Sequence, residues 1–362
     1  MEQRYLPAVV ELWKPFFFDR ERFPDTYRPQ VLVSYSIWEN KPLHPAYLNS
    51  PDRFVFGDSG GFSIVSRGYV PDPERVIRWQ IENCNVGVIL DVPPFRIRGK
   101  HYQATRGAWD NSLERTLHNV RMAKQYYRPD EHPFRWWGVV QGETLDYMNR
   151  WSEAVAEVYP FDGEGEGWAI KPTPANTLES MARSVQWMER HRPSRVHMLM
   201  STGVKTMAIL FSLLKIREVD LDFISYDSAS AGIYTGNRHA WTLTDDGLQV
   251  TEWLPRVYEP EDHLAMAEEC PCAGCQEYRK VAPTKEGHSA VWRYSYDMLF
   301  VHNNIILFEL FDSLAAQAKE DPEALLKLYL GDRYGKALRL MERGSPPKTV
   351  PVGMMDRILD QE

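Results

Sequence analysis

The chain has 362 residues, of which 43% are hydrophobic and 25% charged, close to the average for globular proteins. This composition excludes collagen-like and intrinsically disordered classes, and the length allows one large domain or two medium ones. Fifty Asp and Glu against 42 Lys and Arg give a formal net charge of −8. That balance argues against nucleic-acid binding through bulk positive charge, although a local basic patch remains compatible with it.

Neither a secretory signal nor a membrane span is expected. The N-terminus lacks a short apolar core followed by small residues, and apolar runs such as residues 207–211 fall far short of the roughly 20 residues that cross a bilayer. Three of the four cysteines lie within six residues, which indicates a metal site rather than a disulfide framework. We therefore expect a cytoplasmic protein.

Short apolar or β-branched runs recur along the first two thirds of the chain, and each predicts a buried strand. In chain order they cover residues 31–36, 53–58, 86–91, 134–141, 167–171, 196–201 and 222–227. Segments with helical spacing lie between them, most clearly residues 73–82, 111–125, 144–158, 176–191 and 204–217. Alternating strands and helices predict a parallel α/β fold, which is either a doubly wound sheet or a (β/α)8 barrel.

Polar or ionisable side chains end almost every predicted strand, and this favours the barrel. They are Ser36, Asp58, Asp91, Gln141, Lys171, Ser201 and Asp227. In a TIM barrel the carboxyl ends of the strands converge on one face, which holds the active site, whereas an open sheet spreads them along a line. No glycine-rich dinucleotide fingerprint follows the first predicted strand. For any single residue, an ordinary strand end is the alternative.

The sequence Cys270-Pro-Cys272-Ala-Gly-Cys275 and a histidine 27 residues later, His302, form a candidate metal site. Three thiolates and one imidazole complete a tetrahedral zinc site without an open position, which is typical of a structural metal. His288 is the rival fourth ligand. We prefer His302 because its apolar helical segment can pack on the cysteine loop. Unliganded thiols are the alternative for the cluster, and Cys84 is expected in the core.

Two further motifs place a carboxylate beside small residues. Asp58 lies in Phe-Gly-Asp-Ser-Gly-Gly-Phe, and Asp227 lies in Phe-Ile-Ser-Tyr-Asp-Ser-Ala-Ser-Ala. Glycine at such a strand end lets a ligand approach the backbone. With Asp91, these residues put three carboxylates on one face of the predicted barrel. Such a group can divide the roles of nucleophile, proton carrier and base-reading acceptor, although each carboxylate can also be a cap or an ion-pair partner.

In this order the motifs resemble those of the guanine transglycosylases, enzymes that exchange guanine in a polynucleotide for a 7-deazaguanine. The resemblance covers about residues 31–310 and includes Val-Val-Gln-Gly, Leu-Met-Ser-Thr-Gly-Val and the cysteine motif with its distant histidine. It implies a TIM barrel with an inserted structural zinc subdomain. We expect most of the barrel in residues 1–257, the zinc subdomain in 258–320 and a basic helical tail in 321–362.

The resemblance also implies a role for each matching residue. Asp227 would be the nucleophile that attacks C1′ of the target nucleotide, and Asp58 the general acid/base that deprotonates the incoming base. A carboxylate can capture the oxocarbenium-like state of such a displacement covalently, and a second base can then displace the sugar. The residues expected around the base are Asp91, Gln141, Gly142, Ser59, Gly60, Gly61, Phe62 and Met200. The first three would hydrogen-bond the purine edge, and the last two would sandwich the ring.

Two stretches, residues 167–172 and 228–238, differ from the bacterial tRNA enzymes. The second is closer to the archaeal branch, but the chain is too short for the extra C-terminal RNA-binding domains of that branch. We therefore expect DNA slightly ahead of tRNA as the polymer, with preQ0 or preQ1 (7-cyano- or 7-aminomethyl-7-deazaguanine) as the incoming base. The expected contacts to the polymer backbone are Arg96, Arg98, Lys100 and Arg238. A homo-oligomer is compatible with the sequence.

Two other classes are left open. A metal-dependent barrel hydrolase would need a histidine-rich open site at the strand ends, whereas most of the ten histidines lie between the predicted strands. A non-catalytic nucleic-acid-binding protein that uses the zinc segment would leave the three carboxylates without a role.

Overall fold

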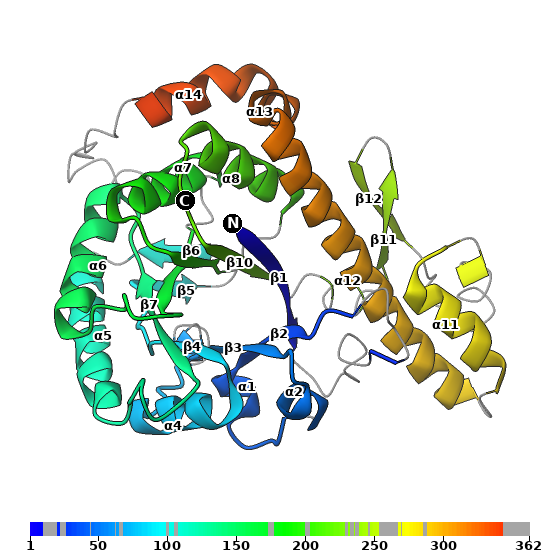
Figure 1. The fold of residues 1–362 in the computed structure, drawn as a ribbon, viewed down its shortest axis with the longest axis horizontal. Coiled ribbons are helices and arrows are strands. Elements are labelled where there is room, and N and C mark those ends of the chain that lie inside the picture. Colours follow the sequence, from blue (N-terminus) through cyan, green and yellow to red (C-terminus); the bar gives the residue numbers. More distant parts are fainter. Residues whose placement is uncertain are drawn as a thin grey trace.

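The computed structural model describes residues 1–9, 20–21, 27–43, 45–61, 63–64, 68–98, 101–104, 108–172, 177–199, 203–228, 231, 235, 239–244, 247–252, 267–268, 270–284 and 288–342. Eight parallel strands form a closed barrel (Figure 1). Around the barrel they are β1 (Glu2–Val9), β10 (Phe223–Ser228), β9 (Arg195–Met198), β8 (Gly167–Ile170), β7 (Arg135–Val140), β4 (Val86–Val88), β3 (Phe54–Asp58) and β2 (Gln30–Ser34). The predicted (β/α)8 barrel is confirmed.

The first barrel strand, β1, was not predicted from the sequence. It closes the barrel by pairing in parallel with β10 and with β2. Tyr5 and Leu6 are buried in it, but Arg4 precedes them and places its guanidinium 4.8 Å from the centre of the Phe54 ring. A cation over the face of an aromatic ring is a stable arrangement, and here it lies at the amino ends of the strands. The charged residue therefore broke the apolar pattern without preventing the strand.

Three strands end two or three residues earlier than predicted, and β7 and β8 end one residue earlier. β4 ends at Val88 rather than at Asp91, and β9 ends at Met198 rather than at Ser201. β2 ends at Ser34, and the predicted last residue, Ser36, lies in the short helix α1 (Tyr35–Trp38). After β4 the chain turns, since the Asp91 N–H donates to the carbonyl of Ile89, and this turn carries Asp91 beyond the strand. The apolar run alone did not indicate where the ladder stops.

The helices around the barrel agree with the predicted ones to within three residues at each end. They are α4 (Pro73–Asn83), α5 (Ala108–Lys124), α6 (Leu145–Val158), α7 (Thr177–His191) and α8 (Val204–Ile216). Their starts have a local cause where a polar side chain caps the first turn. Asp72 accepts from the N–H of Glu74 before α4, and Thr144 accepts from the N–H of Tyr147 before α6. A short helix, α2 (Pro45–Asn49), follows α1.

Two excursions leave the barrel at the carboxyl ends of strands. A hairpin of β5 (Phe95–Arg98) and β6 (His101–Ala104) follows β4. A larger one follows β10 and contains the hairpin of β11 (His239–Thr244) and β12 (Gly247–Glu252), then α11 (Ala273–Val281). The chain returns through α12 (His288–Glu320), which contacts α11 and β11 on one side and β1 and α8 on the other (Figure 1). Helices α13 (Pro322–Leu330) and α14 (Tyr334–Glu342) then pack on α8 and α7.

Helix α12 is a core helix. Residues 296–320 are long and apolar enough to cross a membrane by composition, but 78% of the most apolar window is buried inside the protein. Phe308 and Phe311 meet the ring of Tyr5 at centroid distances of 5.2 and 5.3 Å. Burial of these rings against the barrel accounts for the apolar stretch. The boundaries at residues 257 and 320 stay predictions, since this helix contacts both the barrel and the cysteine-bearing segment.

Aromatic rings fill the barrel interior from the amino ends of the strands to their middle. Phe54 packs on Phe223 at 5.5 Å between ring centres, and Phe56 packs edge-on against Trp137 at 5.6 Å. Trp137 also packs edge-on against Phe223 at 6.1 Å, and its side chain is only 1% exposed. This packed interior leaves the carboxyl ends of the strands as the face on which polar groups can gather.

Candidate functional site

The three predicted carboxylates come together at the carboxyl ends of the strands. Asp58 is the last residue of β3, Asp227 is the penultimate residue of β10, and Asp91 lies three residues beyond β4. Their charges act on one another: that of Asp227 raises the pKa of Asp58, and that of Asp58 raises the pKa of Asp91. Asp91 is 7% exposed and Asp227 is 5% exposed. The barrel mouth therefore gathers three mutually repelling acids, of which Asp91 and Asp227 are buried and Asp58 is partly buried, as is common in active sites.

Asp58 has the surroundings of a proton carrier. The Ser34 hydroxyl donates to its Oδ2 at 2.6 Å, and the Gly60 N–H donates to the same oxygen at 3.3 Å. Burial raises the pKa of Asp58, the Ser34 bond opposes that rise, and the negative charge of Asp227 adds to it. A carboxyl group whose pKa is moved towards neutrality can both give and take a proton during one reaction cycle.

Asp91 and Gln141 form one hydrogen-bonding unit. Gln141 follows β7 and donates from Nε2 to Oδ2 of Asp91 at 2.6 Å, and both side chains are buried. Burial raises the pKa of Asp91 to about 6; the Gln141 bond lowers it and the charge of Asp58 raises it. Gly61 lies so close that a Cβ there would be 2.6 Å from Oδ1 of Asp91. Only glycine leaves this edge of the carboxylate accessible.

Replacing Asp91 with Asn is expected to stabilise the protein at pH 7.5 but not at pH 4. The folded-state pKa lies above the ordinary value, so the stabilising contribution of Asp91 is fully present below about pH 3.9 and is lost as the pH rises through about 6. At neutral pH the buried charge costs on the order of 2–3 kcal/mol, at about 1.4 kcal/mol per pKa unit. Urea unfolding at both pH values measures the difference. Equal stability of the two proteins at pH 7.5 would contradict the raised pKa.

Two glycines shape the loops of the mouth. Gly60 has φ 81°, and a Cβ there would lie 2.9 Å from Cβ of Ser36. Gly142 has φ 155°, and its Cβ would lie 2.6 Å from the backbone nitrogen of Met148 in α6. Both positions therefore require glycine.

Between Asp58 and Gly60, the fully buried Ser59 hydroxyl has no hydrogen-bond partner among the described residues, so it is a donor and acceptor that a ligand can satisfy.

Lys171, predicted as a strand end within the divergent stretch 167–172, lies at this site. It follows β8, and its N–H donates to the carbonyl of Val140 at 3.3 Å, which places it beside Gln141. Burial lowers the pKa of Lys171, and the charges of Asp227, Asp91 and Asp58 raise it. Its ammonium therefore lies in the field of all three carboxylates and offsets part of their charge.

His197 in β9 is a second residue that the sequence analysis missed. Its Nε2 lies 3.2 Å from Oδ1 of Asp227, and its Nδ1 lies 2.9 Å from the hydroxyl of Ser225. The ring stacks on Phe56 with 4.1 Å between centres and 27° between planes. The available signal was a histidine between two apolar residues, Val196 and Met198, of a buried strand. Ser, His and Asp are together here, but the Ser225 and His197 side chains are fully buried, so Ser225 is not an accessible nucleophile.

Several predicted site residues cannot be placed. Phe62, Met200, Lys100 and Arg238 lie outside the described residues. Arg96 and Arg98 lie in β5, directly after the loop that holds Asp91, but their side chains are outside the described part of the chain. Their roles stay predictions.

The predicted metal ligands form a compact cluster where the start of α11 packs against α12. Nδ1 of His302 lies 3.3, 3.5 and 3.6 Å from the sulfurs of Cys272, Cys270 and Cys275. All four ligand atoms lie within 4.8 Å of one another. A tetrahedral ion with metal–ligand distances of about 2.0–2.3 Å would hold a nitrogen and a sulfur roughly 3.5 Å apart. The cluster therefore has the size and donor set to hold a metal ion.

Neighbouring groups fix the orientation of these ligands. Nε2 of His302 lies 2.8 Å from the carbonyl oxygen of Trp241 in β11, so this nitrogen donates and Nδ1 faces the sulfurs. Cys272 caps α11 and accepts from the N–H of Cys275. The rival His288 begins α12, 14 residues before His302. At 1.5 Å per residue the two positions are about 21 Å apart along the helix, which excludes His288 from this cluster.

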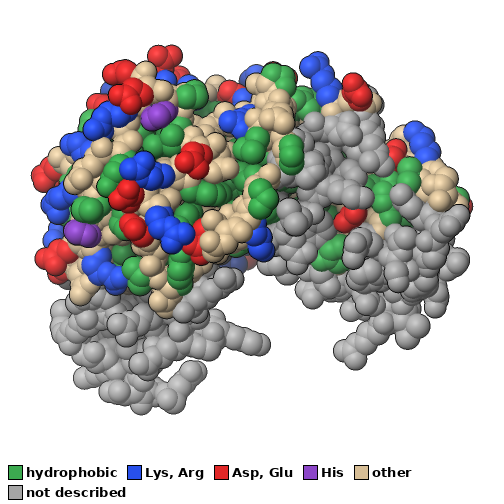
Figure 2. Space-filling model, turned by 90° about the horizontal axis from the view of Figure 1, so that it is seen from below, with side chains coloured by type: hydrophobic (Ala, Val, Ile, Leu, Met, Phe, Trp, Pro, Cys, Tyr) green, Lys and Arg blue, Asp and Glu red, His purple; other side chains and the backbone are tan. Residues whose placement is uncertain are grey.

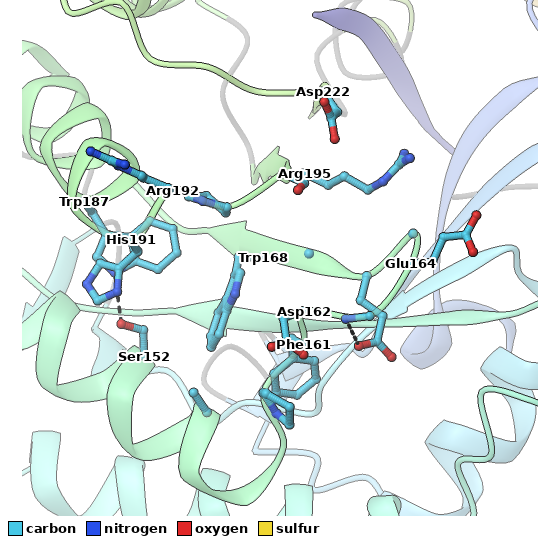
Figure 3. Close-up of a pocket in the computed structure, with 18 of the residues that line it drawn as sticks. Ser152, Phe161, Asp162, Glu164, Trp168, Trp187, His191, Arg192, Arg195 and Asp222 are labelled. Atoms are coloured by element: carbon cyan, nitrogen blue, oxygen red, sulfur yellow. Dashed lines mark hydrogen bonds between the residues drawn. The ribbon is translucent and has the colours of Figure 1, made fainter.

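A cavity of about 440 Å³ lies at the opposite end of the barrel (Figure 3). Its lining includes Gly167 and Arg195, which begin β8 and β9, and Asp222, which precedes β10. Its most buried acid, Glu166, already accepts hydrogen bonds from the Tyr127 and Tyr159 hydroxyls and from the N–H of Gly163. Residues at this end of a barrel serve stability rather than catalysis, so we assign the site to the carboxylate face.

Neither a protein-family model nor a curated protein matches the chain.

Proposed function

We propose that this protein is a guanine transglycosylase, which exchanges guanine in a polynucleotide for a 7-deazaguanine through a covalent aspartyl-glycosyl intermediate. The observation that carries the proposal is the convergence of Asp58, Asp91 and Asp227 on one face of the barrel, in three different environments. Carboxylates in distinct environments can divide acid/base, recognition and nucleophilic work among themselves. The motifs resemble those of the guanine transglycosylases, whose reaction uses such a division of roles.

In the first half-reaction, Asp227 attacks C1′ of the target nucleotide. The C1′–N9 bond breaks, and its electron pair leaves with guanine, which receives a proton from the neutral carboxyl group of Asp58. The raised pKa of Asp58 supports this role. In the second half-reaction Asp58 takes the proton from N9 of the incoming base, which attacks C1′. The ester bond then breaks, and its electron pair returns to Asp227.

Asp91 and Gln141 are the proposed reading edge for the purine. Guanine and 7-deazaguanines present N–H donors at N1 and N2, and a carboxylate accepts both. The Gln141 bond holds Asp91 in place at 2.6 Å, and Gly61 keeps its Oδ1 edge open. The Ser59 hydroxyl supplies a further buried polar group at the mouth. The target base must leave the stack to reach this pocket.

Zinc is the proposed occupant of the Cys270, Cys272, Cys275 and His302 cluster. A closed set of three thiolates and one imidazole suits zinc, which supplies folding energy to the segment around α11 rather than chemistry at C1′. The metal-dependent hydrolase alternative is less well supported, since its open metal site would have to lie at the mouth. The described mouth offers carboxylates, and its histidine, His197, is fully buried.

DNA is the proposed polymer ahead of tRNA, and the protein is proposed to act in the cytoplasm. Residues 167–172 depart from the bacterial tRNA enzymes, and Lys171 from this stretch lies in the field of the three carboxylates. On the face shown in Figure 2, positive and negative side chains alternate among the described residues. Such a surface suits local rather than bulk contact with phosphates, for which the residues around the β5–β6 hairpin and after β10 are candidates.

We expect the protein to release radiolabelled guanine from DNA when preQ0 or preQ1 is supplied. Single-stranded DNA should react faster than duplex DNA, because extruding a stacked base costs a few kcal/mol. The assay compares duplex DNA, single-stranded DNA and bulk tRNA with each base. Exchange on tRNA with none on DNA would overturn the choice of polymer and leave the reaction standing. No release from any of the three would contradict the proposed function.

A further inference from the structure

Beneath the carboxylate face, the barrel interior contains two polar side chains that the proposed reaction does not use. His197 and Ser225 are register partners on the neighbouring strands β9 and β10, and both are fully buried. Asp227 follows two residues after Ser225 in β10, so the two side chains point to the same side of the strand. A buried histidine therefore lies between the barrel core and the proposed nucleophile.

The hydrogen bonds of His197 define which nitrogen bears the proton. An ionised carboxylate only accepts, so the contact of 3.2 Å between Nε2 and Oδ1 of Asp227 requires Nε2–H. Nδ1 then accepts from the hydroxyl of Ser225 at 2.9 Å, a bond that a serine can donate. A neutral imidazole satisfies both contacts. Stacking on Phe56 fixes the plane of the ring.

We infer that His197 is a positioning residue for Asp227. The hydrogen-bonded chain Ser225–His197–Asp227 holds the nucleophilic carboxylate in its reactive orientation. This inference rests on the proposed function. His197 donates to Oδ1, and we assign bond formation with C1′ to Oδ2. Nucleophilic attack depends on orientation, and a displacement of about 1 Å can cost roughly 10²-fold in rate. His197 does not touch the substrate, since its side chain is fully buried.

The same hydrogen bond serves the second half-reaction. In the glycosyl ester, Oδ2 is bonded to C1′ and Oδ1 is the carbonyl oxygen, which continues to accept from Nε2–H. When the incoming base displaces the sugar, negative charge returns to the carboxylate, and a donor aimed at Oδ1 stabilises that charge. Loss of the donor should therefore slow turnover more than it weakens binding of the polymer.

A matched pair of variants separates positioning from packing. The side-chain nitrogen of glutamine reaches the place of Nε2, whereas the shorter asparagine can pair with Ser225 but does not reach Asp227. Both replace the aromatic ring by a smaller amide, so both lose similar packing. We expect His197→Asn to lower kcat roughly 10²-fold with little change in KM, and His197→Gln to recover most of the loss. Ser225→Ala, which removes the bond that fixes the tautomer, should fall between them.

Steady-state kinetics on the preferred polymer, with the rate of adduct formation in a single turnover, provide the readouts. Thermal melting of each variant compares the packing losses of the pair. Equal losses in His197→Asn and His197→Gln would show that packing alone matters and would overturn the inference. Full activity of His197→Asn would overturn it as well. A wild-type protein that is inactive on every polymer would instead refute the proposed function, and with it this inference.

Discussion

Replacing Asp227 by Ala or Asn is expected to reduce base exchange by at least about three orders of magnitude while the protein stays folded. Neither side chain can form a glycosyl ester with C1′, and removal of a nucleophile typically has an effect of at least this size. Guanine release measures the activity, and thermal melting checks the fold. Asp220→Asn is the control. This carboxylate is exposed and lies just before the amino end of β10, whereas Asp227 lies near the carboxyl end of the same strand. A fully active Asp227→Ala protein would refute the assignment of Asp227 as the nucleophile.

Replacing Asp58 is expected to block the reaction at a different step from replacing Asp227. In Asp58→Asn, turnover is expected to fail because no group takes the proton from the incoming base, yet some adduct on Asp227 can still form. Gel analysis under denaturing conditions distinguishes this block from the loss of the nucleophile.

Loss of one metal ligand is expected to release the bound ion and to lower the melting temperature by on the order of 10 °C. The purified protein should contain one tightly held zinc per chain, and Cys272→Ser or His302→Ala should lose it. A structural ion couples its binding energy to folding, and each kcal/mol lost lowers the melting temperature by about 2–4 °C in a large domain. Elemental analysis and thermal melting measure the two effects.

Cys84→Ala is the matched control for the metal prediction. This thiol is buried beside Gly57, where a Cβ would lie 2.7 Å from its sulfur, and it is not part of the cluster. Its loss should leave the metal content unchanged. Stoichiometric zinc in both Cys272→Ser and His302→Ala would refute the ligand set.

Much of the barrel was predictable because its strands are buried on both faces. Such strands appear as apolar runs that end on polar residues, so the place of Asp58, Gln141 and Asp227 at the carboxyl ends of the strands was predictable from local pattern alone. The strand β1 was missed because Arg4 lies inside it, over the ring of Phe54. Its place depends on closure of the barrel between β10 and β2, which no local pattern encodes.

The missed site residues depend on register rather than on motif. His197 meets Asp227 only because β9 and β10 align His197 with Ser225, and a single-sequence pattern does not contain that alignment. Lys171 was visible as a strand end, but its effect on three carboxylates follows from the packing of four strands around one mouth. The cysteine cluster was predictable because three of its four ligands lie within six residues.

Trapping the covalent intermediate is the most direct test of nucleophilic attack by Asp227. The protein is incubated with a guanine-containing oligonucleotide of the polymer that releases guanine, without an incoming base, and is then denatured and digested for mass spectrometry. We predict that one peptide, that containing Asp227, carries the abasic nucleotide as an ester, and that the adduct disappears when a 7-deazaguanine is added before denaturation. An adduct on Asp58 or Asp91, or exchange that proceeds without any adduct, would show that Asp227 is not the nucleophile.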